Sequence, residues 1–223
     1  MIELYNVTKD YPSGTHALHN VSIKIDKGEY VFVVGQSGAG KSTFLKLLML
    51  EELATSGDIF VNNIELGRLK RKKVPFYRRT LGIVFQDFRL INSMSVFDNV
   101  AFPLRIAGVS KRAIRKRVPY VLNLVGLADK YDKMPTQMSG GEQQRVAFAR
   151  AIVNNPAVII ADEPTGNIDP ERSHEMFELL ESINNYGITV ITVTHAHDLV
   201  KKFNKRTIVL DSGRVISDSK YAV

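Results

Sequence analysis

The chain has 223 residues, 44% hydrophobic and 24% charged, and these values exclude a disordered, collagen-like or low-complexity protein. It has no cysteine, which excludes a disulfide framework, a thiolate metal site and a cysteine nucleophile. The net charge is +7, but residues 68–79 and 111–117 hold twelve of the 30 basic residues, so the remainder is mildly acidic. Its longest apolar runs fall far short of the about 20 residues of a spanning helix, so a role at a membrane would need a partner.

Alternation of β-branched and aromatic residues with polar ones dominates the first third of the chain and is typical of strands. In chain order, we predict strands at 2–7, 21–25, 30–34, 58–61, 64–66 and 81–85. Asn62-Asn63, between the fourth and fifth, is typical of a hairpin turn. A helix is expected to follow the third strand, over 43–51.

From about residue 88 to 155 the apolar residues recur at helical spacing, and short buried strands typical of a parallel sheet resume afterwards. These later strands are expected at 157–161, 188–194, 207–210 and 214–217. A helix that carries Met176, Phe177, Leu180 and Ile183 on one face separates the first two of them. Because α/β elements return after the helical stretch, we predict one α/β domain over 1–223, with a helical insertion at about 88–155.

Residues 35–43 read GQSGAGKST and match G-x-x-x-x-G-K-[ST] between a strand and a helix. Glycines allow the loop backbone to cradle phosphate oxygens, and the following helix presents its positive N-terminus to the same anion. Lys41 can reach the β- and γ-phosphates, and the Ser42 hydroxyl can bind Mg²⁺. The predicted nucleotide-binding residues are Gly35, Gln36, Ser37, Gly38, Ala39, Gly40, Lys41, Ser42 and Thr43. The alternative is a glycine-rich turn with a structural role only. The loop alone does not distinguish ATP from GTP.

Asp162 and Glu163 end the apolar run 158–161, so they are expected at the sheet edge where α/β proteins bind ligands. There Asp162 can hold the magnesium ion and Glu163 can polarise the water that attacks the γ-phosphate. The alternative is a pair of acids that end a strand before Pro164.

Ser139–Arg145 read SGGEQQR and open a helix that is expected to run to about residue 154. Ser139 and Glu142 form a capping box, which is consistent with an ordinary helix start, but Gly140 and Gly141 also create a second anion site at the helix terminus.

At this point the sequence resembles the ATP-binding cassette (ABC) ATPases, whose signature LSGGQ appears here as MSGGE, with different first and fifth residues. Other family motifs follow in order. Tyr11 fits the adenine-stacking aromatic, Gln86 the glutamine of the Q-loop, Asp169 the D-loop and His195 the switch histidine. Without the family, Tyr11 is as well explained by packing and Gln86 by a structural role. His197 competes with His195, and the family pattern of strand, Thr and His selects His195.

The resemblance implies a cassette with a P-loop, RecA-like core, an N-terminal antiparallel β-subdomain and an inserted helical subdomain. It implies ATP hydrolysis with Mg²⁺, with Lys41, Gln86, Glu163 and His195 in catalysis and Ser42, Gln86 and Asp162 around the metal. Two copies would pair head to tail, so that Ser139, Gly140, Gly141, Glu142 and Asp169 of one copy face the ATP of the other.

Within the family, residues 84–90, VFQDFRL, resemble the branch that acts in bacterial cell division. This branch implies an integral membrane partner, a place at the cytoplasmic face of the membrane at the division site, and control of peptidoglycan hydrolases. The alternative is the ATPase of a lipoprotein-release system or a macrolide exporter. A member of the family that acts on nucleic acid would carry long coiled coils between the phosphate loop and the signature, and no heptad run is present between them here.

The two basic segments have three interpretations. They are solvated charged faces, a surface that meets anionic lipid headgroups or an acidic part of the membrane partner, or a nucleic-acid site. We expect no nucleic-acid partner, because the body of the chain is acidic.

Overall fold

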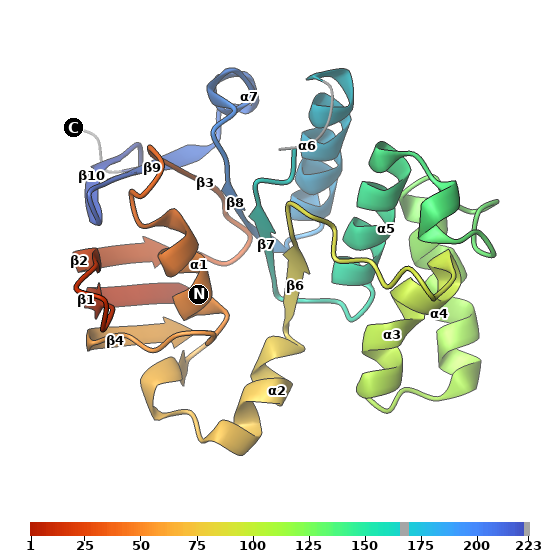
Figure 1. Ribbon diagram of the computed structural model, residues 1–223, viewed down its shortest axis with the longest axis horizontal. Coiled ribbons are helices and arrows are strands. Elements are labelled where there is room, and N and C mark those ends of the chain that lie inside the picture. Colours follow the sequence, from red (N-terminus) through yellow and green to blue (C-terminus); the bar gives the residue numbers. More distant parts are fainter. Residues whose placement is uncertain (166–169, 221–223) are drawn as a thin grey trace.

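The computed structural model describes residues 1–165 and 170–220 and contains two sheets with helices around them (Figure 1). A four-stranded antiparallel sheet has the order β2-β1-β4-β5. A six-stranded sheet has the order β10-β9-β3-β8-β7-β6, and it is parallel except for the β9-β10 pair. The predicted α/β class is confirmed.

Most predicted strands lie within two residues of their observed bounds. The strands are β1 (Ile2–Asp10), β2 (His16–Ile25), β3 (Tyr30–Val34), β4 (Ser56–Val61), β5 (Ile64–Glu65), β6 (Leu81–Val84), β7 (Val158–Asp162), β8 (Thr189–Val193), β9 (Arg206–Asp211) and β10 (Arg214–Asp218). β1 and β2 are longer than predicted because their pairing is interrupted by register shifts, and each shift breaks the alternation that sequence patterning follows. Asn62 and Asn63 both have positive φ, 51° and 63°, as the predicted hairpin turn requires.

The helices are α1 (Lys41–Leu48), α2 (Val74–Arg78), α3 (Val96–Ile106), α4 (Lys111–Leu124), α5 (Gly140–Ile152), α6 (Pro170–Asn185) and α7 (His197–Phe203). The predicted bounds of α1, 43–51, were shifted. The helix begins two residues earlier because Gly40 is its N-cap, and it ends before Leu50, whose φ is 54°. α2 and α7 were not predicted, because five to seven residues are too short for a helical period to show. No helix of the described ranges is both long and apolar enough to cross a bilayer.

Two hydrophobic cores lie on opposite faces of the six-stranded sheet. One packs that sheet against α1 and the antiparallel sheet, and it includes Val31 and Phe44. The other packs the sheet against α3, α4, α5 and α6, and it includes Phe32 and Phe148. α5 therefore lies directly on the sheet while also contacting α3 and α4. The extent of the inserted helical subdomain, about 88–155, stays a prediction.

Candidate functional site

The candidate site lies at one edge of the six-stranded sheet, where four neighbouring parallel strands end. β3, β8, β7 and β6 lie side by side in that order. Their carboxyl ends lead into the glycine-rich loop, His195, the Asp162-Glu163 pair and Gln86, respectively. These residues share a cavity of about 390 Å³. Its lining contains Tyr11, Ser37, Gly38, Gly40, Lys41, Ser42, Thr43, Gln86, Asp162, Glu163 and His195 from the predicted set.

The loop after β3 can be built only from glycine at two positions. Gly35 has a φ of 155°, and a Cβ there would lie 2.1 Å from the carbonyl oxygen of Leu210. Gly40 has a φ of 102° and is the N-cap of α1 with no side chain to satisfy the helix N–H groups. Those uncapped donors suit an anion at the mouth of the helix. Gly35, Gln36 and Ala39 of the predicted set lie outside the cavity lining.

Lys41 is folded against this loop. Its Nζ donates to the carbonyl oxygens of Gly35, at 2.7 Å, and Gln36, at 2.9 Å. Burial lowers the pKa of the Lys41 ammonium, while Glu163 and Asp162 oppose that shift. The charge is therefore held in the cavity by acceptors that a phosphate oxygen can replace, as binding of a nucleotide phosphate requires.

Glu163, just after β7, is held by the end of the neighbouring strand β8. Its N–H donates to Val193 O at 2.9 Å, and its Oε2 accepts from the N–H of His195 at 3.2 Å. Oε1 lies 3.0 Å from Nε2 of His195, yet this buried atom has no aligned hydrogen bond among the described residues. Such an oxygen suits a polarised water.

The environment of Glu163 is strained and poorly solvated. Its φ is 45°, in the left-handed region that costs a non-glycine residue about 1–2 kcal/mol. Burial raises the pKa of the Glu163 carboxyl and outweighs the opposing effects of His195 and Lys41. Strain and a shifted pKa at one residue in a cavity are typical of a catalytic group.

The residues predicted around a magnesium ion fit that group. Ser42, Gln86 and Asp162 line the same cavity and offer oxygen ligands, the type that Mg²⁺ prefers. Burial raises the pKa of Asp162, and the positive charges of Arg89 and Lys41 oppose the rise. Within the described ranges no three acidic or histidine side chains gather to hold a metal. Ser42, Gln86 and Asp162 supply one hydroxyl, one amide and one carboxylate, a donor set that suits an ion which keeps phosphate and water ligands.

Tyr11 lines the cavity, with its hydroxyl 3.3 Å from Thr43 Oγ1. Lys9 Nζ lies 4.9 Å from the centre of its ring. Thr15, His16, Ala17 and Val193 also line the cavity, and sequence reasoning missed them because no motif marks them. His197 does not line it, in agreement with the selection of His195.

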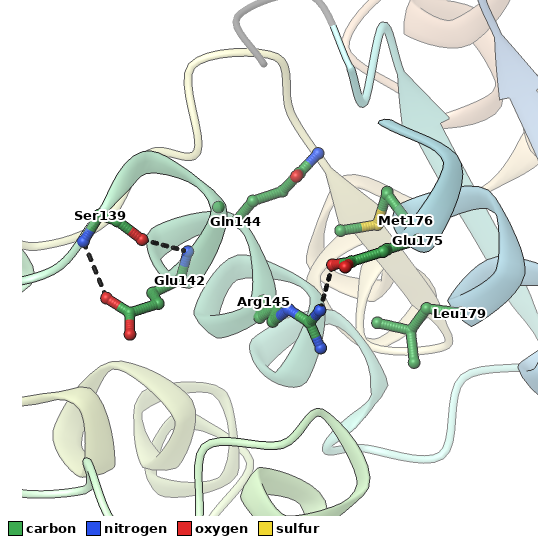
Figure 2. A pocket seen from close by; sticks show the side chains of 8 residues that line it. Ser139, Glu142, Gln144, Arg145, Glu175, Met176 and Leu179 are labelled. Carbon is green, nitrogen blue, oxygen red and sulfur yellow. Dashed lines mark hydrogen bonds and ion pairs between the residues drawn. The ribbon is translucent and has the colours of Figure 1, made fainter. Parts of the chain in front are cut away.

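The second predicted anion site is separate from the first. Ser139, Gly141 and Glu142 line a different cavity of about 220 Å³ between α5 and α6 (Figure 2), and the two cavities share no residue. The capping box is confirmed, since Ser139 Oγ accepts from the N–H of Glu142 and Glu142 Oε2 accepts from the N–H of Ser139. Gly140 is the first residue of α5, and Asp169 lies outside the described residues.

A phosphate loop at the centre of the sheet and a separate signature helix define a nucleotide-binding cassette. In agreement, the ABC transporter family matches residues 18–166, and the chain belongs to this family. It is an ABC-type ATPase that binds ATP, as its sequence resemblance implied.

Relatives support the predicted branch of the family. The chain is 51% identical to the cell division ATP-binding protein FtsE of Bacillus subtilis, over 98% of this chain and 96% of the relative. It is 49% identical to FtsE of Mycobacterium tuberculosis, over 100% and 97%, and 46% identical to FtsE of Escherichia coli, over 96% and 97%.

Solved structures share the fold. The ATP-binding cassette MJ0796, a dimer in a post-hydrolysis state bound to ADP and Pi, superimposes with a TM-score of 0.88. It is 37% identical, over 98% of this chain and 97% of that one. CbiO1 of Clostridium perfringens gives a TM-score of 0.91 at 34% identity, over 97% and 87%. The predicted cassette fold is confirmed.

Proposed function

We propose that this chain is the ATP-hydrolysing subunit of an FtsEX-type complex. In this complex it would bind an integral membrane subunit resembling FtsX at the cytoplasmic face of the bacterial membrane, at the division site. ATP-driven changes would pass through that subunit to peptidoglycan hydrolases. The observation that carries the proposal is the near full-length similarity to FtsE from three bacteria, combined with the meeting of Lys41, Glu163 and His195 in one cavity.

Seven residues that line the cavity would divide the tasks of ATP hydrolysis between them. Lys41 would exchange its two backbone acceptors for phosphate oxygens. Ser42, Gln86 and Asp162 would hold Mg²⁺, which supplies charge neutralisation on the phosphates. Glu163 Oε1 would accept a proton from the attacking water, and His195 keeps that carboxylate oriented from 3.0 Å away. Tyr11, which lines the same cavity, would stack on the adenine.

We infer that two copies pair head to tail when ATP binds. Ser139 and the start of α5 are built as an anion site, yet they lie in a cavity separate from the phosphate loop of their own chain. A two-fold axis would place this site of each copy, with Gly140, Gly141, Glu142 and Asp169, against the nucleotide of the other. The dimeric state of the similar cassette MJ0796 supports this arrangement.

This chain has a groove that suits a helix of the membrane subunit. A cavity of about 320 Å³ lies between α2, β6, α3 and α5 and is lined mainly by apolar side chains. Its lining includes Pro75, Leu81, Ile83, Phe102 and Ile106. β6 leads directly into the segment of Gln86, so a helix seated there would contact the elements that carry the catalytic glutamine.

The test combines a catalytic variant with capture of the partner. Glu163→Gln should still bind ATP, lose most of its turnover and accumulate as an ATP-bound dimer in size-exclusion chromatography, whereas Glu51→Gln, at an exposed position, should behave as the wild type. Near-normal turnover in Glu163→Gln would contradict the role of the base. Co-purification from detergent-solubilised membranes should yield a subunit resembling FtsX. Recovery of an exporting permease would replace the proposal by the exporter or lipoprotein-release alternative.

A further inference from the structure

Two long stretches of the chain contain cations and no acids. Between Glu65 and Asp87 there are seven basic residues and no acidic one, and between Asp98 and Asp129 there are six and none. An ordinary solvated surface intersperses both signs of charge. Two stretches with basic residues only, in a chain whose remainder is mildly acidic, therefore favour an anionic binding partner.

The cations of these stretches divide into those with a partner in the fold and those without one. Arg78 donates to the carbonyl oxygens of Met49 and Leu50, and Arg117 donates to those of Ile152 and Val153. These cations hold the fold together. Arg68 pairs with Glu65, Arg79 donates to the carbonyl oxygen of Ile106, and Arg105 pairs with Asp98. The remaining eight, the free cations, are exposed and make no hydrogen bond or ion pair within the described part of the chain, and they are Lys70, Arg71, Lys72, Lys73, Lys111, Arg112, Arg115 and Lys116.

The two stretches are joined in space. Arg79, just after α2, donates from Nη2 to the carbonyl oxygen of Ile106 at the end of α3, at 3.1 Å. α4, with Lys111 and Arg112 in its first turn, begins only five residues after Ile106. Figure 1 shows α2 and the loop between α3 and α4 at the same lower end of the molecule, opposite α7. The free cations thus border one continuous surface.

This surface also exposes apolar side chains. Phe76 is 60% exposed and Ile106 is 55% exposed, although both are large hydrophobic residues. The guanidinium of Arg79 lies 4.9 Å from the centre of the Phe76 ring, which places an aromatic face among the cations. Cations combined with exposed aromatic and aliphatic side chains are typical of surfaces that lie against a lipid headgroup layer.

We propose that these eight free cations, with Phe76, form a basic face that binds anionic phospholipid headgroups directly. The inference rests on the proposed function, because that function brings the chain to a membrane and seats the membrane subunit in the groove between α2 and α3, beside this face. Lysine ammonium groups on flexible stems suit the phosphates of a fluid layer. None of the three cavities described above is lined by a free cation. Lipid contact would orient the cassette independently of the membrane subunit.

The experiment uses the purified full chain and vesicles without any membrane protein. Vesicles of phosphatidylcholine with about 30 mol% phosphatidylglycerol should sediment the chain, and pure phosphatidylcholine vesicles should not. Raising NaCl from about 0.05 to about 0.5 M should release it, because the Debye length shortens about threefold. Equal binding to both vesicles, or binding that ignores salt, would overturn the inference.

A matched pair of variants places the binding on the surface. Lys70→Glu/Lys72→Glu/Lys73→Glu should weaken vesicle binding by about tenfold or more. Lys27→Glu/Lys201→Glu/Lys202→Glu changes the net charge equally at exposed positions away from this face and should weaken it far less. Equal losses in both variants would reduce the effect to net charge and contradict a defined face.

Two further measurements separate the alternatives. Tighter binding of a single-stranded DNA oligonucleotide than of anionic vesicles, abolished by the same triple substitution, would assign the face to nucleic acid and overturn the lipid proposal. Capture of the membrane subunit in detergent tests the proposed function separately. The Lys70/Lys72/Lys73 variant should keep both that capture and its basal ATPase activity while it loses vesicle binding. Loss of capture together with unimpaired vesicle binding would instead assign the face to the protein partner.

Discussion

Arg150 is predicted to position the segment that follows the catalytic glutamine. It lies near the end of α5 and donates from Nη1 to the carbonyl oxygen of Arg89, at 2.5 Å, and from Nη2 to that of Phe88, at 2.6 Å. Phe88 and Arg89 have φ values of 56° and 47°, in the left-handed region. The guanidinium thus holds two consecutive strained residues just after Gln86, and it does so from the helix that begins with the signature.

The magnitude follows from these contacts. Two hydrogen bonds from a charged donor contribute about 3–6 kcal/mol together, and relaxation of the two left-handed residues would return about 2–4 kcal/mol. Arg150→Met should therefore lower the free energy of unfolding by only about 1–2 kcal/mol. Turnover should fall as well, because Gln86 loses its position and the charge of Arg89 moves away from Asp162, where it opposes the rise in pKa that burial causes.

The assay is steady-state ATPase activity together with urea unfolding. Arg150→Met should reduce kcat about tenfold, which corresponds to about 1.4 kcal/mol in the barrier, with KM for ATP changed little. Arg117→Met is the matched control, because Arg117 also donates to two carbonyls, those of Ile152 and Val153, but away from the cavity. It should be destabilised more, by about 3–6 kcal/mol, because Ile152 and Val153 are not left-handed and no strain is returned, yet kcat should be preserved. Equal kcat losses in both variants, or unchanged kcat in Arg150→Met, would refute the positioning role.

Three further outcomes are expected. Because burial raises the pKa of Glu163 and the base must be deprotonated, kcat/KM should rise with pH through a range above that of an ordinary glutamate, and this acid limb should be absent in the residual activity of Glu163→Gln. Gly35→Ala should prevent stable folding, since its Cβ would lie 2.1 Å from Leu210 O, whereas Gly38→Ala, with nothing within 4 Å, should cost about 1–2 kcal/mol in thermal unfolding. Ser139→Ala should lower the free energy of unfolding by about 1 kcal/mol by removing the N-cap of α5, and unchanged stability would contradict the capping box.

Local chemistry was readable from the sequence wherever neighbouring residues create it. The glycine-rich loop before Lys41, the capping box at Ser139 and the hairpin at Asn62-Asn63 all depend on residues within a few positions of one another, and each is present in the structure. The buried strands β7 and β8 were also predicted, because continuous apolar runs mark strands that are covered on both faces.

Features that depend on distant residues could not be read in this way. The order β3-β8-β7-β6 brings Gln86, Asp162 and His195 around Lys41, and no local pattern encodes which strands become neighbours. The family resemblance supplied their roles, but their meeting in one cavity is a property of the sheet.

The basic segments show the same division. The net charge of +7 and its concentration in 68–79 and 111–117 are properties of the amino-acid sequence alone. Only in the folded chain do Arg78 and Arg117 donate hydrogen bonds to carbonyl oxygens of other elements, while Lys70, Lys72 and Lys73 stay exposed without a partner. The physical reason is that a charge is a property of one residue, whereas a partner requires two segments to be brought within hydrogen-bond distance by the packing of the whole domain.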